Sequence, residues 1–215
     1  IAAELGNFYG ALGTEVTIIQ RGPTLLSRED KDVAEKFTSV WQKKYNVILN
    51  ASVDKVSKTG KNISVTVGGH RKELTAEKLL VATGIQPNSD RLNLEKAGVK
   101  TNQNGFIIVN QFMETSAKNI WALGDIAGVY LFKHSANQEA EYVLQNFFGK
   151  KKAVDYYPMP HAIFTNPQIA GVGITEQEAL EQKKNYVAAT YEYKNTGMGA
   201  ALAEEDGFVK FIVDK

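Results

Sequence analysis

The first twenty residues predict a helix followed directly by a short buried strand, and this order constrains the fold more than any other feature. Apolar residues recur at helical spacing through residues 1–12, and Gly13 offers a stop at the C-terminal end. The apolar run at 16–19 has the length of a short buried strand. A helix that leads into a strand is the second half of a βαβ crossover, which joins parallel strands. We therefore expect an α/β fold with doubly wound, Rossmann-like domains.

Helices and strands continue to alternate along the chain. A Ser followed by acidic residues, and then by apolar residues on one face, predicts a capped amphipathic helix over 27–45. Further strands are expected at 50–58, 62–67 and 71–76, which form a β-meander, and at 78–88, 105–110 and 120–123. A helix is expected at 135–149, and the rest of the chain has the pattern strand, helix, strand, strand.

The charge balance and the absence of cysteine exclude several classes of function. Lys and Arg (25) nearly equal Asp and Glu (24) over 215 residues, so no overall field recruits nucleic acid. No apolar run approaches the roughly 18 residues of a membrane span, and we expect a cytoplasmic location. Without cysteine the chain holds no disulfide framework, thiolate metal site or thiol redox chemistry of its own. Its three scattered histidines predict neither a metal site nor a catalytic triad.

An apolar strand that ends on a charge is predicted at residues 120–125, IWALGD. In doubly wound sheets, ligands bind at the carboxyl ends of the strands. Gly124 allows the backbone to approach a ligand closely, and Asp125 supplies an acceptor there. An Asp at the end of a strand is otherwise most often a helix cap or a turn former. Both interpretations are open from these six residues alone.

Four segments, in this order, carry a resemblance over essentially the whole chain: IAAELG, LLVATGIQPN, TSAKNIWALGD and HAIFTNPQIAGVG. Together they resemble the flavin-dependent pyridine nucleotide-disulfide oxidoreductases, and within them the dihydrolipoamide dehydrogenases and mercuric reductases. The resemblance implies most of an NAD(P)-binding domain at 1–85, the second part of an FAD-binding domain at 86–152, and the start of an α+β dimer-interface domain at 153–215.

The resemblance also implies an FAD site. Residues 115–125 match the second flavin fingerprint of the family, in which Asp125, after Gly124, binds a ribityl hydroxyl of FAD. A helix whose N-terminus faces the flavin pyrimidine is implied at Leu131, Phe132, Lys133 and His134. There the backbone N–H groups and the helix dipole would stabilise negative charge on the reduced ring. His134 then acts through its backbone. His161 is interpreted as structural, and His70 as solvated.

The nicotinamide cofactor is implied to bind near the N-terminus. Ile1 and Glu4 match the first turn of the helix that faces the cofactor pyrophosphate, and Val53 and Gly84 also match pocket positions. Gln20 occupies the position where lipoamide dehydrogenases have an acid that binds the adenosine ribose. With Arg21 and Arg28 nearby, we expect relaxed or NADP-leaning specificity, because Arg pairs with a 2′-phosphate. The alternative is that both arginines are solvated surface residues.

The family's redox-active Cys-x4-Cys pair and its C-terminal His-Glu pair have no counterpart in these residues, and we expect no catalytic residue in the chain. We therefore interpret the chain as an inactive internal fragment, lacking the first strand and Gly loop of the NAD(P) domain. The expected parent is a homodimer that passes hydride from NAD(P)H through FAD to or from a dithiol or disulfide, as in dihydrolipoamide dehydrogenase, which can belong to a 2-oxoacid dehydrogenase complex. The alternatives are an enzyme like mercuric reductase, NAD(P)H oxidase or coenzyme A-disulfide reductase, or a non-catalytic nucleotide-binding remnant. A flavin-free NAD dehydrogenase is disfavoured by the second Gly-Asp segment.

Overall fold

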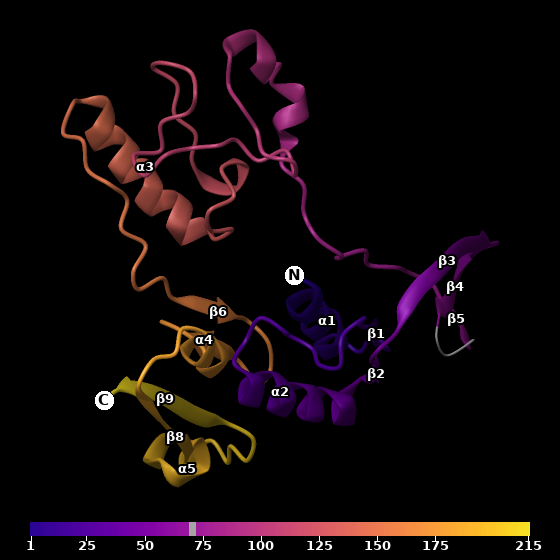
Figure 1. Cartoon of the computed structure of the whole chain (residues 1–215). Coiled ribbons are helices and arrows are strands. Elements are labelled where there is room, and N and C mark those ends of the chain that lie inside the picture. Colours follow the sequence, from indigo (N-terminus) through magenta and orange to yellow (C-terminus); the bar gives the residue numbers. More distant parts are fainter. Residues whose placement is uncertain (69–71) are drawn as a thin grey trace. The chain divides into compact units, whose positions relative to one another are not determined.

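The computed structural model describes residues 1–68 and 72–215, which form two compact units. The first unit joins residues 1–81 to 162–215, and the second holds residues 82–161. Figure 1 shows the elements of both units along the coloured chain. The first unit is therefore assembled from two segments that are far apart in sequence. The functional boundaries expected at residues 85 and 152 stay predictions.

A parallel strand–helix–strand crossover opens the first unit. Helix α1 (Ala2–Ala11) leads to β1 (Thr17–Ile19), as predicted. β1 pairs in parallel with β2 (Asn46–Ile48), and α2 (Lys31–Lys44) connects the two strands. Parallel pairing requires such a crossover, so the expected α/β arrangement is confirmed here.

Helix α2 covers this pair of strands with an aromatic face. Phe37 and Trp41 are at most 1% exposed, and their ring centroids lie 4.7 Å apart. The helix begins at Lys31, directly after the acidic residues Glu29 and Asp30 and four residues later than the predicted start at Ser27. Its N-cap is Asp30, whose carboxylate accepts a hydrogen bond from the Asp32 N–H at 3.1 Å. A carboxylate in this position also interacts favourably with the helix dipole.

The predicted β-meander is confirmed. It consists of β3 (Ser52–Thr59), β4 (Asn62–Gly68) and β5 (Lys72–Ala76), paired antiparallel in that order. Val65 and Val67 of β4 are buried with Ala51, while β3 is exposed along its length. His70, expected to be solvated in the turn before β5, lies outside the described residues.

The C-terminal segment follows the predicted order of strand, helix, strand, strand, with one strand and one helix added. β6 (His161–Ile163) and β7 (Ile169–Gly171) precede α4 (Glu176–Glu181), which Thr175 and Glu178 begin with a capping box. β8 (Tyr186–Glu192) then pairs antiparallel with β9 (Phe208–Asp214). Between them lies the unpredicted short helix α5 (Gly197–Ala201).

The second unit is mostly irregular, and three strand predictions in this unit or at its start are wrong. Residues 78–88, 105–110 and 120–123 contain no strand among the described residues. Their regular pairing is limited to two isolated bridges, Thr101 to Ile107 and Glu114 to Trp121. A strand exists only through hydrogen bonds to a neighbour, and apolar runs alone do not supply one. Val81 is 71% exposed, so this run does not build a core in the described structure either.

Helix α3 (Lys133–Phe147) organises the second unit through a buried polar face. Ser135 and Glu139 are fully buried, and Asn146 is 7% exposed. The Asn146 side-chain amide donates hydrogen bonds to the carbonyls of Phe112 and Lys152, at 3.2 and 3.0 Å. Buried polar side chains thus satisfy backbone groups that a sheet would otherwise pair. The helix starts two residues before the predicted 135–149, and its existence is confirmed.

No described helix has both the length and the apolar character to span a bilayer.

Candidate functional site

Asp125 lies on a tight turn that is held on both sides. The turn is the 3₁₀ helix η3 (Gly124–Ile126), where Gly124 has a φ of +72° that favours glycine. Its carbonyl accepts a hydrogen bond from the Ala127 N–H at 2.9 Å. On the other side of Asp125, the Ile126 carbonyl accepts one from the Ile107 N–H at 2.9 Å. The backbone that carries the Asp125 carboxylate therefore has little freedom.

Helix α3 supports this turn from beneath. The buried Gly124 N–H donates a hydrogen bond to Oε2 of Glu139 at 2.5 Å. One helical turn earlier on α3, the Cβ of Ala136 would lie only 3.3 Å from a Cβ added at Gly124. Both the positive φ and this close approach favour a residue without a side chain. The group that approaches Gly124 is a helix of the same chain, and the predicted approach of the Gly124 backbone to a ligand stays a prediction.

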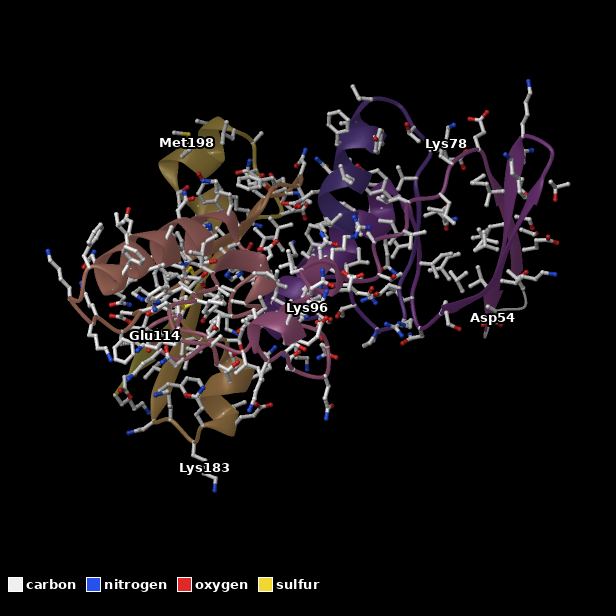
Figure 2. The ribbon with its side chains drawn as sticks, turned by 90° about the horizontal axis from the view of Figure 1, so that it is seen from above. Asp54, Lys78, Lys96, Glu114, Lys183 and Met198 are labelled. Atoms are coloured by element: carbon white, nitrogen blue, oxygen red, sulfur yellow. The ribbon has the colours of Figure 1, made fainter. Side chains whose placement is uncertain are left out.

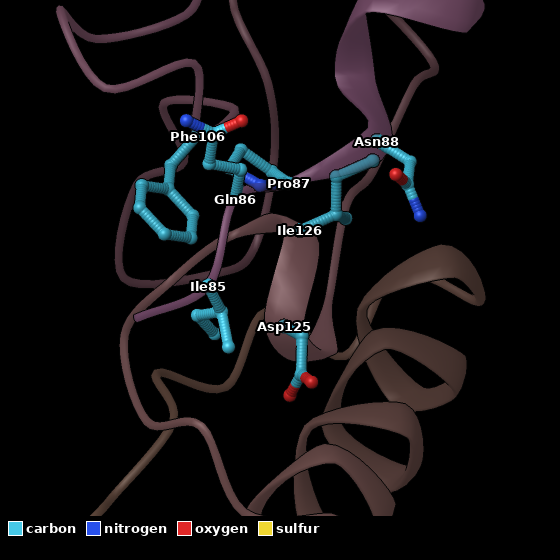
Figure 3. Close-up of a pocket in the computed structure, with 7 residues that line it drawn as sticks. All are labelled: Ile85, Gln86, Pro87, Asn88, Phe106, Asp125 and Ile126. Atoms are coloured by element: carbon cyan, nitrogen blue, oxygen red, sulfur yellow. The ribbon is translucent and has the colours of Figure 1, made fainter. Parts of the chain in front are cut away.

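A hollow of about 340 Å³ opens beside Asp125. Figure 3 shows Asp125 extending from its turn, with Phe106 and the stretch 85–88 around the same space. The other lining residues are uncharged, so an exposed carboxylate is set among apolar and amide groups. A hollow of this size holds one part of a dinucleotide and not the whole. A carboxylate accepts hydrogen bonds, so the fitting part is one that carries hydroxyl donors.

The N-terminus of α3 is the second feature of this site. Its N-cap residue, Phe132, makes no side-chain capping hydrogen bond. The first N–H groups of a helix have no partner within the helix, so this end can donate to an electron-rich group. The Phe132 ring is stacked on the His134 ring at 5.1 Å, and the His161 ring lies parallel at 6.4 Å. A His134 ring nitrogen lies 2.8 Å from the Pro160 carbonyl. The His134 side chain thus has a structural contact.

The four residues expected at the start of a helix are found there. Leu131 and Phe132 precede α3, and Lys133 and His134 are its first residues. The Lys133 ammonium donates to Oδ1 of Asn137 at 2.6 Å, within the same helix. The Asp125 turn is held in a fixed position relative to this helix end, because Glu139 and Ala136 of α3 both contact Gly124 of the turn. A hydroxyl-bearing chain at Asp125 and an electron-rich ring at the helix end both match the groups present, so these residues fit a flavin.

Glu4 makes a contact that its sequence context did not predict. Its carboxylate accepts a hydrogen bond from the Phe164 N–H at 3.2 Å. Three residues along α1, Asn7 accepts one from the Asn166 N–H at 3.2 Å. Glu4 and Asn7 thus attach α1 to the segment after β6. Asn7 was not expected to take part, although its spacing from Glu4 puts both on one helical face.

Gln20 follows β1, and its amide is used within its own loop. Its side-chain Nε2 donates to the Thr24 carbonyl at 3.0 Å. Arg21 and Arg28 in the same loop region are exposed. Val53 is 46% exposed on β3, opposite Val67 of β4. These residues all belong to the first compact unit.

Gly84 belongs to the second compact unit, where its φ is +148°. It is the one residue of the expected nicotinamide set that the second unit contains.

Two residues at the Asp125 turn were missed from the sequence. Glu139 is fully buried, and its Oε1 accepts a hydrogen bond from the Tyr156 hydroxyl at 2.7 Å. Burial and this hydrogen bond to the carboxylate raise the pKa of Tyr156. The available signal was the helical spacing of Ser135, Glu139 and Asn146, which places three polar residues on one face. That face would ordinarily be interpreted as the solvated one.

A second charged cluster, in the first compact unit, was also missed. The Lys210 ammonium donates to carboxylates of Asp30, Asp32 and Glu176 at 2.8, 2.6 and 2.6 Å. The Lys210 side chain is 7% exposed. The Tyr186 hydroxyl donates to the other oxygen of Glu176 at 3.0 Å. This cluster joins α2, α4 and β9, and we name it the Lys210 clamp. Among the described residues, no group of three or more His, Asp or Glu side chains is arranged to hold a metal ion.

The chain is similar to known flavoprotein oxidoreductases over its whole length. Residues 1–140 match the family model described as pyridine nucleotide-disulphide oxidoreductase, and residues 159–215 match its dimerisation domain. A mercuric reductase from Staphylococcus aureus is 38% identical over the full chain, which spans 40% of that protein. A dihydrolipoyl dehydrogenase from Geobacillus stearothermophilus is 34% identical, and the chain spans 46% of it. The solved HOCl-induced flavoprotein disulfide reductase RclA from Escherichia coli superposes with a TM-score of 0.90 at 28% identity, over 99% of this chain and 49% of that one.

Proposed function

Because the chain belongs to the pyridine nucleotide-disulphide oxidoreductases, we propose that it is the cofactor-binding and interface part of a flavoenzyme that moves hydride between NAD(P)H and a dithiol or disulfide. Members of this family use FAD together with NADH or NADPH. The family and the fold class predicted from the sequence are confirmed. The chain spans less than half the length of the relatives described above, so the activity proposed is that of the whole protein.

The observation that carries this proposal is Asp125 on its fixed turn. Bound FAD would supply the two-electron chemistry that links a nicotinamide to a disulfide. The Asp125 carboxylate would accept a hydrogen bond from a ribityl hydroxyl of FAD, and Gly124 lets the backbone turn there. The uncapped start of α3, from Leu131 to His134, would supply N–H donors for the electron-rich part of the ring. A preformed donor array of this kind stabilises charge at little reorganisation cost.

The nicotinamide cofactor is assigned to the first compact unit. Its proposed contacts in this unit are Ile1 and Glu4 at the start of α1, together with Gln20 and Val53. Arg21 and Arg28 are exposed cations near the end of β1, which supports a preference for NADP. Apart from the cofactors, the proposed assembly is a homodimer located in the cytoplasm.

Dihydrolipoamide is the first candidate for the substrate, with a 2-oxoacid dehydrogenase complex as the setting. Mercuric ion is the second, favoured by the 38% identity to a mercuric reductase and by the basic Arg21 region. The Arg21 argument concerns the nicotinamide and not the electron acceptor. Assays of the full-length protein with lipoamide and with Hg(II) separate the two candidates.

Replacing Asp125 with Asn tests the flavin assignment. The chain is expressed with the flanking sequence that its gene encodes, and the dissociation constant for FAD is measured by flavin fluorescence. We expect Asp125→Asn to weaken FAD binding about 10-fold, because the Asn amide keeps an acceptor oxygen but loses the charge, which strengthens a hydrogen bond by roughly 1–1.5 kcal/mol. Glu141→Gln, which neutralises an exposed carboxylate on α3, is the control and leaves the affinity unchanged.

Two results would contradict the proposal. A colourless full-length protein with no diaphorase activity would exclude the flavoenzyme. A yellow protein whose Asp125→Asn variant binds FAD normally would return Asp125 to the role of a turn former.

A further inference from the structure

Glu139 is a fully buried carboxylate on α3, next to the turn that carries Asp125. It is 0% exposed, and it accepts hydrogen bonds from two groups on different segments. One is the Gly124 N–H at 2.5 Å, and the other is the Tyr156 hydroxyl at 2.7 Å. A buried carboxylate is costly unless its oxygens are hydrogen-bonded, and here each oxygen has a donor.

The hydrogen bond to Gly124 fixes the peptide at the start of the turn that carries Asp125. The Gly124 N–H belongs to the peptide unit between residues 123 and 124, so Glu139 sets the orientation at which the chain enters the turn. On the far side, the Ile107 N–H holds the Ile126 carbonyl at 2.9 Å. Asp125 lies between these two attachments, and its own side chain is exposed toward the hollow. Glu139 is thus hydrogen-bonded to the residue that directly precedes Asp125, the proposed flavin ligand.

The hydrogen bond from Tyr156 connects Glu139 to the last residues of the second unit. Tyr156 lies in the stretch that follows α3 and leads toward β6. Its ring packs on that of Tyr130 with centroids 5.2 Å apart, and Tyr130 precedes the start of α3. The Tyr130 carbonyl lies 3.4 Å from the Ser135 hydroxyl, the second polar group on the buried face of α3. The Asp125 turn and the approach to the α3 N-terminus are therefore joined through Glu139 and Tyr156.

We propose that Glu139 is a positioning residue for FAD, which holds the Asp125 carboxylate in place by fixing the Gly124 peptide and the Tyr156 hydroxyl. Glu139 does not contact the cofactor and acts through Asp125. This inference rests on the proposed flavin site at Asp125. It predicts that removing the Glu139 acceptor weakens FAD binding only as long as Asp125 is present to be positioned.

The test compares two substitutions of nearly equal size in the full-length protein. Glu139→Met removes both acceptor oxygens, whereas Glu139→Gln keeps one oxygen for the Gly124 N–H. The dissociation constant for FAD is measured on flavin-free protein by flavin fluorescence, well below the thermal midpoint of each variant. We expect Glu139→Met to raise the constant at least about 10-fold and Glu139→Gln to stay within about threefold. Glu139→Asp, which keeps the charge but withdraws the carboxylate by one methylene, is the second variant in case Glu139→Met does not fold, and we expect it to resemble Glu139→Met.

A double-mutant cycle with Asp125→Ala, which leaves no acceptor oxygen to be positioned, separates positioning from stability. If Glu139 acts through Asp125, adding Glu139→Met to Asp125→Ala changes the FAD constant less than about threefold. Full additivity in this cycle, or unchanged affinity in both folded Glu139→Met and Glu139→Asp, would overturn the positioning role and leave the FAD site standing. An Asp125→Asn variant with normal FAD affinity would instead overturn the site itself, and the positioning role with it.

Discussion

At the scale of single residues, the two side chains that follow β1, Gln20 and Arg21, make different contacts. Gln20 donates its amide to the Thr24 carbonyl and so shapes the loop. Arg21 is exposed beside it and is available to a ligand. The chemistry of Arg21 could be inferred from its position after an apolar strand. The use of Gln20 within the loop could not, because a hydrogen bond across four residues depends on the conformation of the turn.

Arg21 is the residue with which to test cofactor preference. We expect Arg21→Gln in the full-length protein to lower kcat/KM for NADPH about 10-fold and to change that for NADH little, because a paired guanidinium is lost only for the 2′-phosphate. Steady-state kinetics with both nucleotides measure this. Lys43→Gln, an exposed cation near the end of α2, serves as the control. Wild-type turnover with NADH equal to or better than with NADPH would contradict the proposed preference.

At the scale of elements, the Lys210 clamp explains how two segments distant in sequence form one compact unit. Lys210 on β9 is 180 residues from Asp30, the N-cap of α2, and it also bonds Glu176 at the start of α4. Burial alone would raise the pKa of Asp30, but its hydrogen bonds with Lys210 and two backbone N–H groups lower it. Burial alone would lower the pKa of Lys210, but its carboxylate partners raise it. Each of these elements follows from local patterns, whereas their joining by charge depends on tertiary contacts.

Replacing Lys210 with Met should destabilise the folded protein by about 2 kcal/mol, because the substitution leaves the Asp30 carboxylate, which is 11% exposed, without its charged partner. Urea unfolding of the full-length protein measures the loss. Lys36→Met is the matched control, since Lys36 pairs with Asp206 at 3.1 Å on an exposed surface and contributes at most about 1 kcal/mol. An equal loss of unfolding free energy in the two variants would show that the Lys210 clamp stabilises the fold no more than an exposed ion pair does.

The same clamp predicts a dependence of stability on pH. The pKa of folded Asp30 lies below its ordinary value of 3.8, so its contribution is complete above that pH and is lost as the pH falls through the folded value. The pKa of folded Lys210 lies above its ordinary value of 10.5, so its contribution is complete below that pH and is lost on passing the folded value. The stability difference between wild type and Lys210→Met should therefore be flat between these limits and shrink in acid. A difference that grows in acid would contradict this account.

At the scale of the whole molecule, the β8–β9 hairpin has two different faces. Lys210 and Ile212 lie on the partly buried face with Tyr186 and Ala188. On the opposite face, Val187 and Val213 are paired across the two strands, and Phe211 of β9 lies on the same face as Val213. All three are 48–59% exposed. An apolar sheet face left open in the dimerisation domain is what a subunit interface requires.

Phe211→Glu tests this face as the dimer contact. We expect it to raise the dimer dissociation constant at least about 30-fold, since a central aromatic contributes about 2 kcal/mol or more. Light scattering of the full-length protein over a dilution series measures the change. Thr190→Glu adds the same charge to the other face of the hairpin and should leave the assembly intact. A Phe211→Glu variant that remains as tightly dimeric as wild type would place the interface elsewhere.

Except for β2, β7 and α5, the sequence by itself determined the elements of residues 1–76 and 161–215, together with the family and the candidate role of Asp125. These depend on helical and strand periodicity and on short ordered segments, which are local properties. Only the tertiary structure decided that residues 78–123 stay without strands, because pairing depends on a neighbour that a pattern does not contain. It also decided that Glu139 and Lys210 are buried among their hydrogen-bond partners, since the burial of a charge depends on which distant groups reach it.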